Sequence, residues 1–335
     1  MSKKVALALG VTALAAPVGA VSASGSRTFD HTYGARWSPA GSRVAFVARG
    51  NGRNPALEVA SAAGTRPVKL TSNWYVAQAP AWSPRARKLA FVRMKNVSQS
   101  NEASSLWTID IRTRVKQRLA LSSARYDLNS DLSWSPSGSR IAFTLLDEAH
   151  GAAAYRIYTV KATGGSRRLL TAGQHPDWSP DGKTIVFDST PWPYSTTEVW
   201  AVNADGTGAR LLAARAVQPK FSPDGRRIAF ERDGDSWSMN SDGSGQQRLT
   251  DAPEAEGTPR WSPDGHRIAF LRGSSSYQLY VMNADGSGEA HIAPSSGFEL
   301  DPDWSPNGKT IAYARCTSIN PRSCRVAFAN VGASP

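Results

Sequence analysis

The chain has few of the residues from which compact catalytic and metal sites are built. Its 335 residues include two cysteines and five histidines, and the cysteines do not have the spacing of a zinc-binding pair. The GxSxG motif of serine hydrolases, the HExxH motif of zinc peptidases and the acidic loop of EF-hand proteins are all missing. We therefore predict a protein that is not an enzyme and that holds no metal or cofactor.

Long apolar runs are missing outside the N-terminus. There, Lys3 and Lys4 precede an apolar stretch at 5–21, and residues 21–23 (VSA) offer the small side chains of a cleavage site. A membrane anchor is the alternative, but the stretch is short and weakly hydrophobic for a span. We expect residues 1–23 to be a signal peptide, so that the mature chain is extracytoplasmic (periplasmic or secreted) and is not inserted in the membrane.

The two cysteines, Cys316 and Cys324, have seven residues between them. In an oxidising compartment they would form a disulfide, and closing so short a loop contributes about 2.5 kcal/mol in the chain-entropy model. Two unpaired thiols are the alternative. Export makes the disulfide the better prediction.

Charge gives a weaker indication of the partner. The chain has 39 Lys and Arg residues against 27 Asp and Glu residues, a net charge of +12. The basic residues are distributed over every repeat without a long Lys/Arg run, and the chain is expected to be exported, so we predict no nucleic-acid partner. An anionic envelope polymer or an acidic protein is a better candidate than nucleic acid, and a simply solvated basic surface is favoured over both.

A ten-residue motif organises the rest of the chain. Residues 261–270 read WSPDGHRIAF, and six related copies begin WSPAG, WSPRA, WSPSG, WSPDG, FSPDG and WSPNG. The seven copies start at Trp37, Trp82, Trp134, Trp178, Phe221, Trp261 and Trp304, at spacings of 40 to 52 residues. Repeats of this length with about four strands each are typical of the blades of a β-propeller.

Each copy predicts a strand, a tight turn and a buried strand. In the sixth copy, Pro263 presets φ for the turn, Asp264 can bond its own backbone, and Gly265 tolerates a left-handed conformation. The apolar run 268–270 (IAF) is typical of a strand that is covered on both faces. A third strand (such as 279–282), a second Asp-Gly turn and a short fourth strand (such as 248–250) follow.

We name the four strands of each unit A to D, with A ending at the motif aromatic. The pattern predicts an all-β fold: a seven-bladed β-propeller of four-stranded antiparallel blades, formed as a single domain by residues 24–335. The seventh unit ends after a strand C at 325–328, and the segment 27–33 (RTFDHTY) has no partner of its own. We predict that this N-terminal segment adds the outer strand of the last blade and closes the ring.

The second unit departs from the pattern in its turn. Ala86 stands where the other copies have glycine. Its turn must therefore differ from the others or carry a strain of about 1 kcal/mol.

The motif WSPDGxxIAF, followed by LYVMNADGSG and RLT, resembles the repeat of TolB-type propellers, which also occurs in the propeller parts of prolyl-oligopeptidase-like proteins. The resemblance covers nearly all of the expected mature chain. TolB carries an α/β domain ahead of a six-bladed propeller, and the peptidases carry a hydrolase domain. Neither is expected here, so the resemblance implies a propeller alone, without the specific role of TolB.

We expect a ligand on the face where the D–A and B–C loops gather, because variable loops on a rigid scaffold commonly form binding sites. Aromatic and carboxylate side chains there suit a carbohydrate, a peptide or a basic side chain. The alternative is that the aromatics pack the loops and the acids pair locally with Arg. The candidate residues are Trp74, Tyr126, Asp131, His175, Asp177, Trp192, Arg260, Phe298, Asp301 and Asp303.

Four arginines, Arg93, Arg232, Arg272 and Arg315, each follow the aromatic residue of strand B by two positions. Repeat symmetry places them in a partial ring near the B–C rim. They could bind an anion, but we favour pairing of each with a carboxylate from a D–A loop.

The predicted function is that of an exported, monomeric, non-enzymatic propeller that binds a protein or an envelope polysaccharide at the channel mouth. The alternative is a carbohydrate-active enzyme such as a metal-assisted lyase, because some TolB-like propellers are of that kind. His175 with Asp177, Asp301 and Asp303 could start its site.

Overall fold

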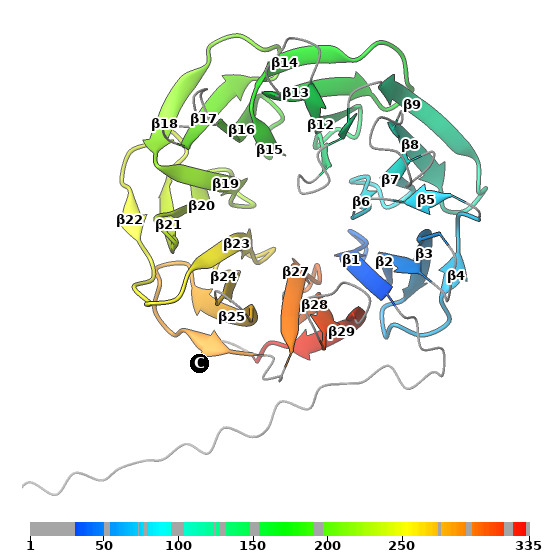
Figure 1. Cartoon of the computed structure of the whole chain (residues 1–335). Helices are drawn as coiled ribbons and strands as arrows, with labels where there is room; N and C mark the ends of the chain where they lie inside the picture. Colours follow the sequence, from blue (N-terminus) through cyan, green and yellow to red (C-terminus); the bar gives the residue numbers. More distant parts are fainter. Residues whose placement is uncertain are drawn as a thin grey trace, which may run out of the picture.

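The fold is a ring of seven antiparallel sheets around a central channel (Figure 1). The computed structural model describes residues 31–49, 54–72, 74–76, 79–94, 104–122, 125–126, 132–147, 154–189, 197–273, 276–292, 297–317 and 324–332. These residues form strands, turns and loops, and no helical segment among them has the length and apolar character of a transmembrane span. The predicted seven-bladed, all-β propeller is confirmed.

The strands follow the blades in chain order. Blade 1 contains β1 (His31–Trp37), β2 (Arg43–Arg49), β3 (Ala56–Ser61) and β4 (Val68–Lys69). Blade 2 contains β5 (Tyr75–Val76), β6 (Ala81–Trp82), β7 (Lys88–Met94), β8 (Ser104–Asp110) and β9 (Lys116–Ser122). Blade 3 contains β10 (Arg125–Tyr126), β11 (Ser133–Trp134), β12 (Arg140–Asp147), β13 (Ala154–Lys161) and β14 (Arg168–Ala172). In blades 2 and 3, two short strands together take the place of strand A.

The other four blades have an uninterrupted strand A. Blade 4 contains β15 (Gln174–Trp178), β16 (Thr184–Ser189), β17 (Glu198–Asn203) and β18 (Arg210–Ala214). Blade 5 contains β19 (Ala216–Phe221), β20 (Arg227–Arg232), β21 (Asp235–Asn240) and β22 (Gln247–Arg248). Blade 6 contains β23 (Glu256–Trp261), β24 (Arg267–Arg272), β25 (Gln278–Asn283) and β26 (Ala290–His291). Blade 7 contains β27 (Phe298–Trp304), β28 (Thr310–Cys316) and β29 (Cys324–Asn330).

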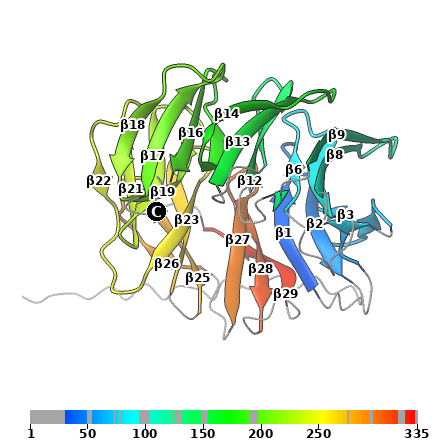
Figure 2. The same cartoon turned by 45° about the horizontal axis from the view of Figure 1, so that its top comes forward.

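Strand A of each blade lies nearest the channel, and B, C and D follow outward (Figures 1 and 2). Because neighbouring strands are antiparallel, the A–B and C–D turns gather on one face of the ring, which we call the turn face. The D–A and B–C connections gather on the other, the loop face. The order of the strands along the chain therefore decides which segments meet at each end of the channel.

The motif forms the predicted turn. In blade 6 the Ser262 N–H donates to Arg267 O at 2.8 Å, and Gly265 adopts φ 72°. The Ser262 hydroxyl donates to Asp264 Oδ1 at 2.5 Å, and the same oxygen accepts the His266 N–H at 3.0 Å. The aspartate thus satisfies backbone of its own turn, as the sequence predicts.

The apolar run after the turn is buried on both faces. Ile268 and Phe270 belong to a hydrophobic layer that includes Ala229 of blade 5, whereas Ala269 packs in the next layer, beside Ile311 of blade 7. Successive side chains of a strand point to opposite faces, so one strand B contributes to the contacts with both neighbouring blades. This explains why the run is continuously apolar rather than alternating.

The residue just before the motif aromatic also joins adjacent blades, and it does so by a hydrogen bond at every seam. At three seams the side chain of this residue accepts the backbone N–H of the next blade's motif aromatic. These acceptors and donors are Asp303 and Trp37 (2.6 Å), Ser133 and Trp178 (3.3 Å), and Asp177 and Phe221 (3.0 Å).

At the other four seams, the backbone carbonyl of the same residue accepts the indole N–H of the next motif tryptophan. These acceptors and donors are Arg36 and Trp82 (2.9 Å), Ala81 and Trp134 (3.1 Å), Lys220 and Trp261 (3.1 Å), and Arg260 and Trp304 (3.0 Å). The indole nitrogens of Trp37 and Trp178, at seams of the first kind, are buried and have no hydrogen-bond partner among the described residues. Among the described residues, each seam therefore has one of the two hydrogen bonds, either to the backbone N–H or to the indole N–H of the motif aromatic.

Closure of the ring differs from the prediction. His31–Tyr33 pairs with β2 as the start of strand A in blade 1, so this part of 27–33 does not add to β29; residues 27–30 lie outside the described residues. Blade 7 has three strands among the described residues. Its seam with blade 1 is packed through Trp37 and Phe328, with ring centroids 5.7 Å apart. The Thr32 hydroxyl adds a hydrogen bond to Cys324 O at 3.3 Å.

The predicted disulfide between Cys316 and Cys324 is present in the structure. The two residues are paired directly across β28 and β29, and both are buried. The bond therefore holds the loop-face end of the last blade.

Ala86 adopts the same left-handed conformation as the glycines of the other turns. Its φ is 53°, and its N–H donates to Ser83 O at 2.8 Å as in the other copies. The turn of blade 2 therefore keeps its shape and carries the strain. We expect Ala86→Gly to raise the free energy of unfolding by about 1 kcal/mol in urea titrations. Ala40→Gly, at a turn position outside the left-handed region, should give no gain.

The two kinds of seam can be compared with matched substitutions. Trp304 donates its indole N–H across a seam, whereas the equally buried Trp178 does not. Replacement by Phe removes similar ring volume at both positions but removes a hydrogen bond only at Trp304. Trp304→Phe should therefore lower the free energy of unfolding by about 1–2 kcal/mol more than Trp178→Phe. Equal losses would show that the indole hydrogen bond contributes nothing.

Candidate functional site

A cavity of about 430 Å³ lies in the central channel at the turn face. Every blade contributes the residue that precedes its motif aromatic: Arg36, Ala81, Ser133, Asp177, Lys220, Arg260 and Asp303. Further parts of its wall are formed by the motif prolines Pro39, Pro180 and Pro223 and by five of the motif aromatics, Trp37, Trp82, Trp178, Phe221 and Trp261. A rigid ring thus presents one variable side chain per blade to a common space.

A repeated bulge in strand A sets this arrangement. The register of strand A against strand B shifts just before the motif in blades 1, 4, 5, 6 and 7. The residue at the bulge has a left-handed φ in each: Gly34, His175, Gln218, Thr258 and Asp301. The extra residue locally bends the strand, and the chain then resumes pairing one residue before the aromatic.

The cavity contains both acidic and basic side chains, and the two kinds differ in how they take part in the seams. The Asp177 and Asp303 carboxylates accept seam hydrogen bonds, and Asp177 also lies 3.9 Å from Lys220 Nζ. Arg36, Lys220 and Arg260 serve the seams through their backbone carbonyls instead. The hydrogen bond from the indole N–H to these carbonyls therefore does not depend on the identity of the side chain.

The structure brings three of the predicted site residues together, namely Asp177, Arg260 and Asp303. Arg36 and Lys220 complete the charged part of the cavity and were missed. A signal for them exists in the sequence, because the position before the motif aromatic changes from copy to copy while the motif repeats. The cavity lies at the end of the channel opposite to the loop face, where the sequence had led us to expect the site.

The other candidates lie elsewhere. The ring of Trp74 packs 4.7 Å from that of Trp107 and below the guanidinium of Arg93, 4.3 Å away. Phe298 packs against the disulfide, and Asp301 Oδ2 accepts the Gly34 N–H across the seam at 3.2 Å. Asp131 and Trp192, and the side chain of Tyr126, lie outside the described residues.

His175 belongs to a chain of polar contacts across blades 4 to 6. Its Nδ1 lies 3.0 Å from both oxygens of Asp188, which is buried. Asp188 also accepts the Gln218 N–H at 2.9 Å, and Gln218 Oε1 accepts the Thr258 N–H at 2.9 Å. His175 is thereby held in the wall, and the described residues contain no group of three His, Cys, Asp or Glu side chains that could hold a metal ion.

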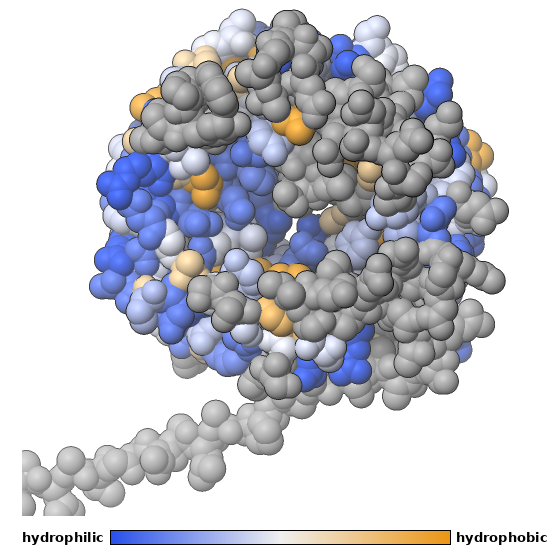
Figure 3. All heavy atoms as spheres, viewed as in Figure 1, coloured by the Kyte–Doolittle hydropathy of each residue, from blue (hydrophilic) through white to orange (hydrophobic). Residues whose placement is uncertain are grey.

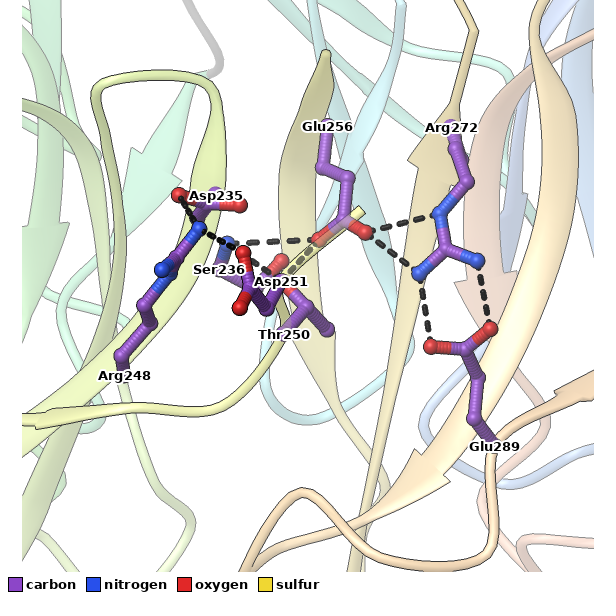
Figure 4. A network of polar contacts seen from close by, with 8 residues as sticks. All are labelled: Asp235, Ser236, Arg248, Thr250, Asp251, Glu256, Arg272 and Glu289. Atoms are coloured by element: carbon purple, nitrogen blue, oxygen red, sulfur yellow. Dashed lines mark hydrogen bonds and ion pairs between the residues drawn. The ribbon is translucent and has the colours of Figure 1, made fainter. Parts of the chain in front are cut away.

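The carboxylates of the loop side connect blades as well (Figure 4). Glu256, at the start of β23, is buried and accepts hydrogen bonds from the Thr250 hydroxyl and the Ser236 N–H of blade 5. Arg272 donates to Glu256 at 2.8 Å and, on its other side, to Glu289 at 2.5 Å. The expected pairing with a D–A carboxylate is therefore confirmed for Arg272, whereas Arg93 and Arg232 lie over aromatic rings.

Glu231 is the most perturbed acid of this region. Burial, together with the negative charges of Asp188 and Glu256, raises its pKa to about 7 from an ordinary value of 4.5, and the nearby His175 acts in the opposite direction. Gly257 makes room for this carboxyl, because a Cβ there would lie 2.9 Å from Glu231 Oε2. The side chain is thus enclosed among acids and is partly protonated near neutral pH.

This shift makes stability depend on pH with a defined sign. The folded state keeps a proton on Glu231 that the unfolded state releases, so stability falls as pH rises between about 4.5 and 7. Between pH 5 and pH 8 the wild type should lose on the order of 1–3 kcal/mol more than Glu231→Gln. Urea titrations at the two pH values measure this difference, and parallel losses in the two proteins would contradict it.

Hydrophilic residues gather on the loop face over the blades that hold this network, on the left of Figure 3, where the middle of the ring is hollowed. Two contrasting environments therefore occupy the two sides of the ring. On the loop side, acids and arginines are used to hold blades 5 and 6 together. On the turn side, a cavity gathers one side chain from each blade.

A comparison with curated proteins finds a relative that matches part of the chain. A curated relative, the uncharacterised peptidase YuxL of Bacillus subtilis (strain 168), is 29% identical over 112 residues, which are 32% of this chain and 16% of the relative. The chain thus matches a small part of that protein's length.

Solved structures show the same fold. An oligogalacturonate lyase in complex with manganese superposes with a TM-score of 0.71 at 16% identity, covering 90% of this chain and 89% of the lyase. TolB from Acinetobacter baumannii superposes with a TM-score of 0.57 at 20% identity, covering 83% of this chain and 67% of TolB. The model of the TolB beta propeller domain family matches residues 33–235 and 212–331, and the chain belongs to this family.

Proposed function

We propose that the chain is an exported, non-enzymatic binding protein whose central channel receives a segment of another protein. The observation that carries the proposal is the turn-face cavity, to which all seven blades contribute. A cavity of this size is in the range of ligand pockets, and a rigid frame reduces the ordering that binding requires. The disulfide and the family are consistent with an extracytoplasmic location.

The lining favours a polypeptide. Arg36, Lys220 and Arg260 give the cavity positive charge, and Asp177 and Asp303 add negative charge while their carboxylates also accept seam hydrogen bonds. The tryptophans and prolines between them provide apolar surface for side chains. A protein segment carries all three kinds of group, whereas a uniformly acidic polymer would be opposed by the two aspartates.

The enzymatic alternative, a metal-assisted lyase, has less support. Within the described residues His175 is engaged with Asp188, and Asp177 and Asp303 hold seams. The structural likeness to the lyase is at 16% identity and concerns the fold. Binding therefore remains the better proposal for this chain.

Photo-crosslinking in intact cells that produce the protein tests the channel. We expect p-benzoylphenylalanine at position 220, in the cavity wall, to form an adduct with a protein. The same group at position 211, on the exposed outer strand β18, should form none. The combined change Arg36→Glu and Arg260→Glu should abolish the adduct in a variant that still folds, as checked by thermal denaturation, because both seam carbonyls remain.

Two outcomes would contradict the proposal. Adducts that form equally from positions 220 and 211 would show that the channel is not the site. An adduct that persists at full yield in the charge-reversed variant would show that the charged cavity wall does not contribute to recognition.

A further inference from the structure

The charge of the turn face is unevenly distributed among the blades. The A–B and C–D turns of blades 2 and 3 (83–88, 110–116, 135–140 and 161–168) contain ten Lys and Arg residues and one acid. The corresponding turns of blades 4 and 5 (179–184, 203–210, 222–227 and 240–248) contain five basic residues and four acids. Although basic residues are dispersed along the sequence, the fold therefore concentrates their excess on one side of the turn face.

A groove of about 610 Å³ lies within this basic region, between blades 2 and 3. It is lined by the A–B turn of blade 2 and by both turns of blade 3. Its charged side chains are Arg85, Arg87, Lys88, Arg140 and Lys161, and the lining includes no Asp or Glu. The equivalent pocket between blades 4 and 5 is smaller, about 190 Å³, and is lined by Asp181 and Asp224 with Arg210. The basic groove is thus a property of this pair of blades and not of the repeat.

Most of the positive charge in the groove is not compensated by the described part of the protein. Arg87 pairs with Asp110 at 2.7 Å. Hydrogen bonds from the Thr113 N–H and from Arg87 keep the pKa of that carboxyl below its ordinary range, so the pair stays ionised. The other four cations form no ion pair within the described residues. Several like charges along one groove attract anions and raise their local concentration.

The uncharged residues that line the groove indicate which kind of anion fits. Trp134, Pro84 and Ala162 line it, and the indole N–H of Trp134 is already bonded to Ala81 O, which leaves the ring carbons for a ligand. The hydroxyls of Ser137, Ser139 and Thr163 stand beside the cations. Sugar rings offer C–H faces to aromatic carbon and hydroxyls to polar neighbours, and a carboxylate on each ring would meet Arg and Lys.

We propose that the groove between blades 2 and 3 binds an acidic polysaccharide, a chain of sugar rings that carry carboxylates. A polymer fits better than a small anion, because the cations come from three separate turns along the groove. The groove is separate from the channel cavity, so the chain can hold an envelope glycan while the channel holds a protein segment. Binding at the groove does not depend on the proposed function of the channel.

The test uses the purified full chain and polygalacturonate as probe, with uncharged dextran as the comparison polymer. We expect polygalacturonate to bind in calorimetry, with affinity that falls as salt concentration rises, and dextran not to bind. The combined change Arg85→Glu and Arg140→Glu should weaken binding by about tenfold or more, equivalent to about 1.4 kcal/mol. The matched change Arg210→Glu and Arg226→Glu, in the turns of blades 4 and 5, should weaken it by less than about threefold.

The proposal is overturned if polygalacturonate binds both double variants equally, or if dextran binds as tightly as polygalacturonate. It is also overturned if double-stranded DNA or polyphosphate binds the wild type more tightly, because phosphate and not a sugar carboxylate would then be the recognised group. Lys161→Glu, a single change at an exposed position, should weaken polygalacturonate binding even if the groove double variant does not fold.

Discussion

The ring depends on one hydrogen bond across each blade seam. This bond joins the motif aromatic of one blade to the residue before the motif in the preceding blade. Within the described residues neighbouring blades share no strand ladder, so apolar layers and a few polar contacts must hold them in register. Buried polar groups need partners, and each seam satisfies one by either an indole N–H or a backbone N–H donor. The same position in the repeat therefore accommodates two kinds of seam hydrogen bond.

The two kinds of seam hydrogen bond differ in whether the side chain or the backbone of the residue before the motif is the acceptor. Where Asp177, Ser133 or Asp303 precedes the motif, the side chain itself completes the seam. Where Arg36, Ala81, Lys220 or Arg260 stands there, the backbone carbonyl accepts the seam hydrogen bond instead. At these four positions the hydrogen bond to the indole N–H is made by the backbone and not by the side chain. The residue that varies beside the repeated motif therefore lines the channel cavity.

On the turn face, too, the backbone geometry is kept while the side chains differ between blades. In blades 4 to 6 the motif aspartate, such as Asp264, is used to satisfy its own turn. Blades 2 and 3 have Arg85 and Ser137 at that position, and their turns keep the same backbone hydrogen bonds. Loss of the acid does not change the fold, because the turn is fixed by its backbone. It does change the field in front of two blades from nearly balanced to strongly positive.

The blades could be predicted from the sequence, because the spacing of seven motifs, the turn chemistry of SPDG and the apolar IAF run are local signals of strands and turns. The disulfide was predicted separately, from the short spacing of Cys316 and Cys324 and the expected export. The sequence also indicated Asp177, Arg260 and Asp303 as site residues. It could not show that Arg36 and Lys220 join them, or that Arg85, Arg140 and Lys161 share a groove. Nor could it show that His175 and Glu256 are used inside the wall. These groupings depend on which ends of separate strands meet around a closed ring, and only tertiary packing between blades brings residues so distant in the chain together.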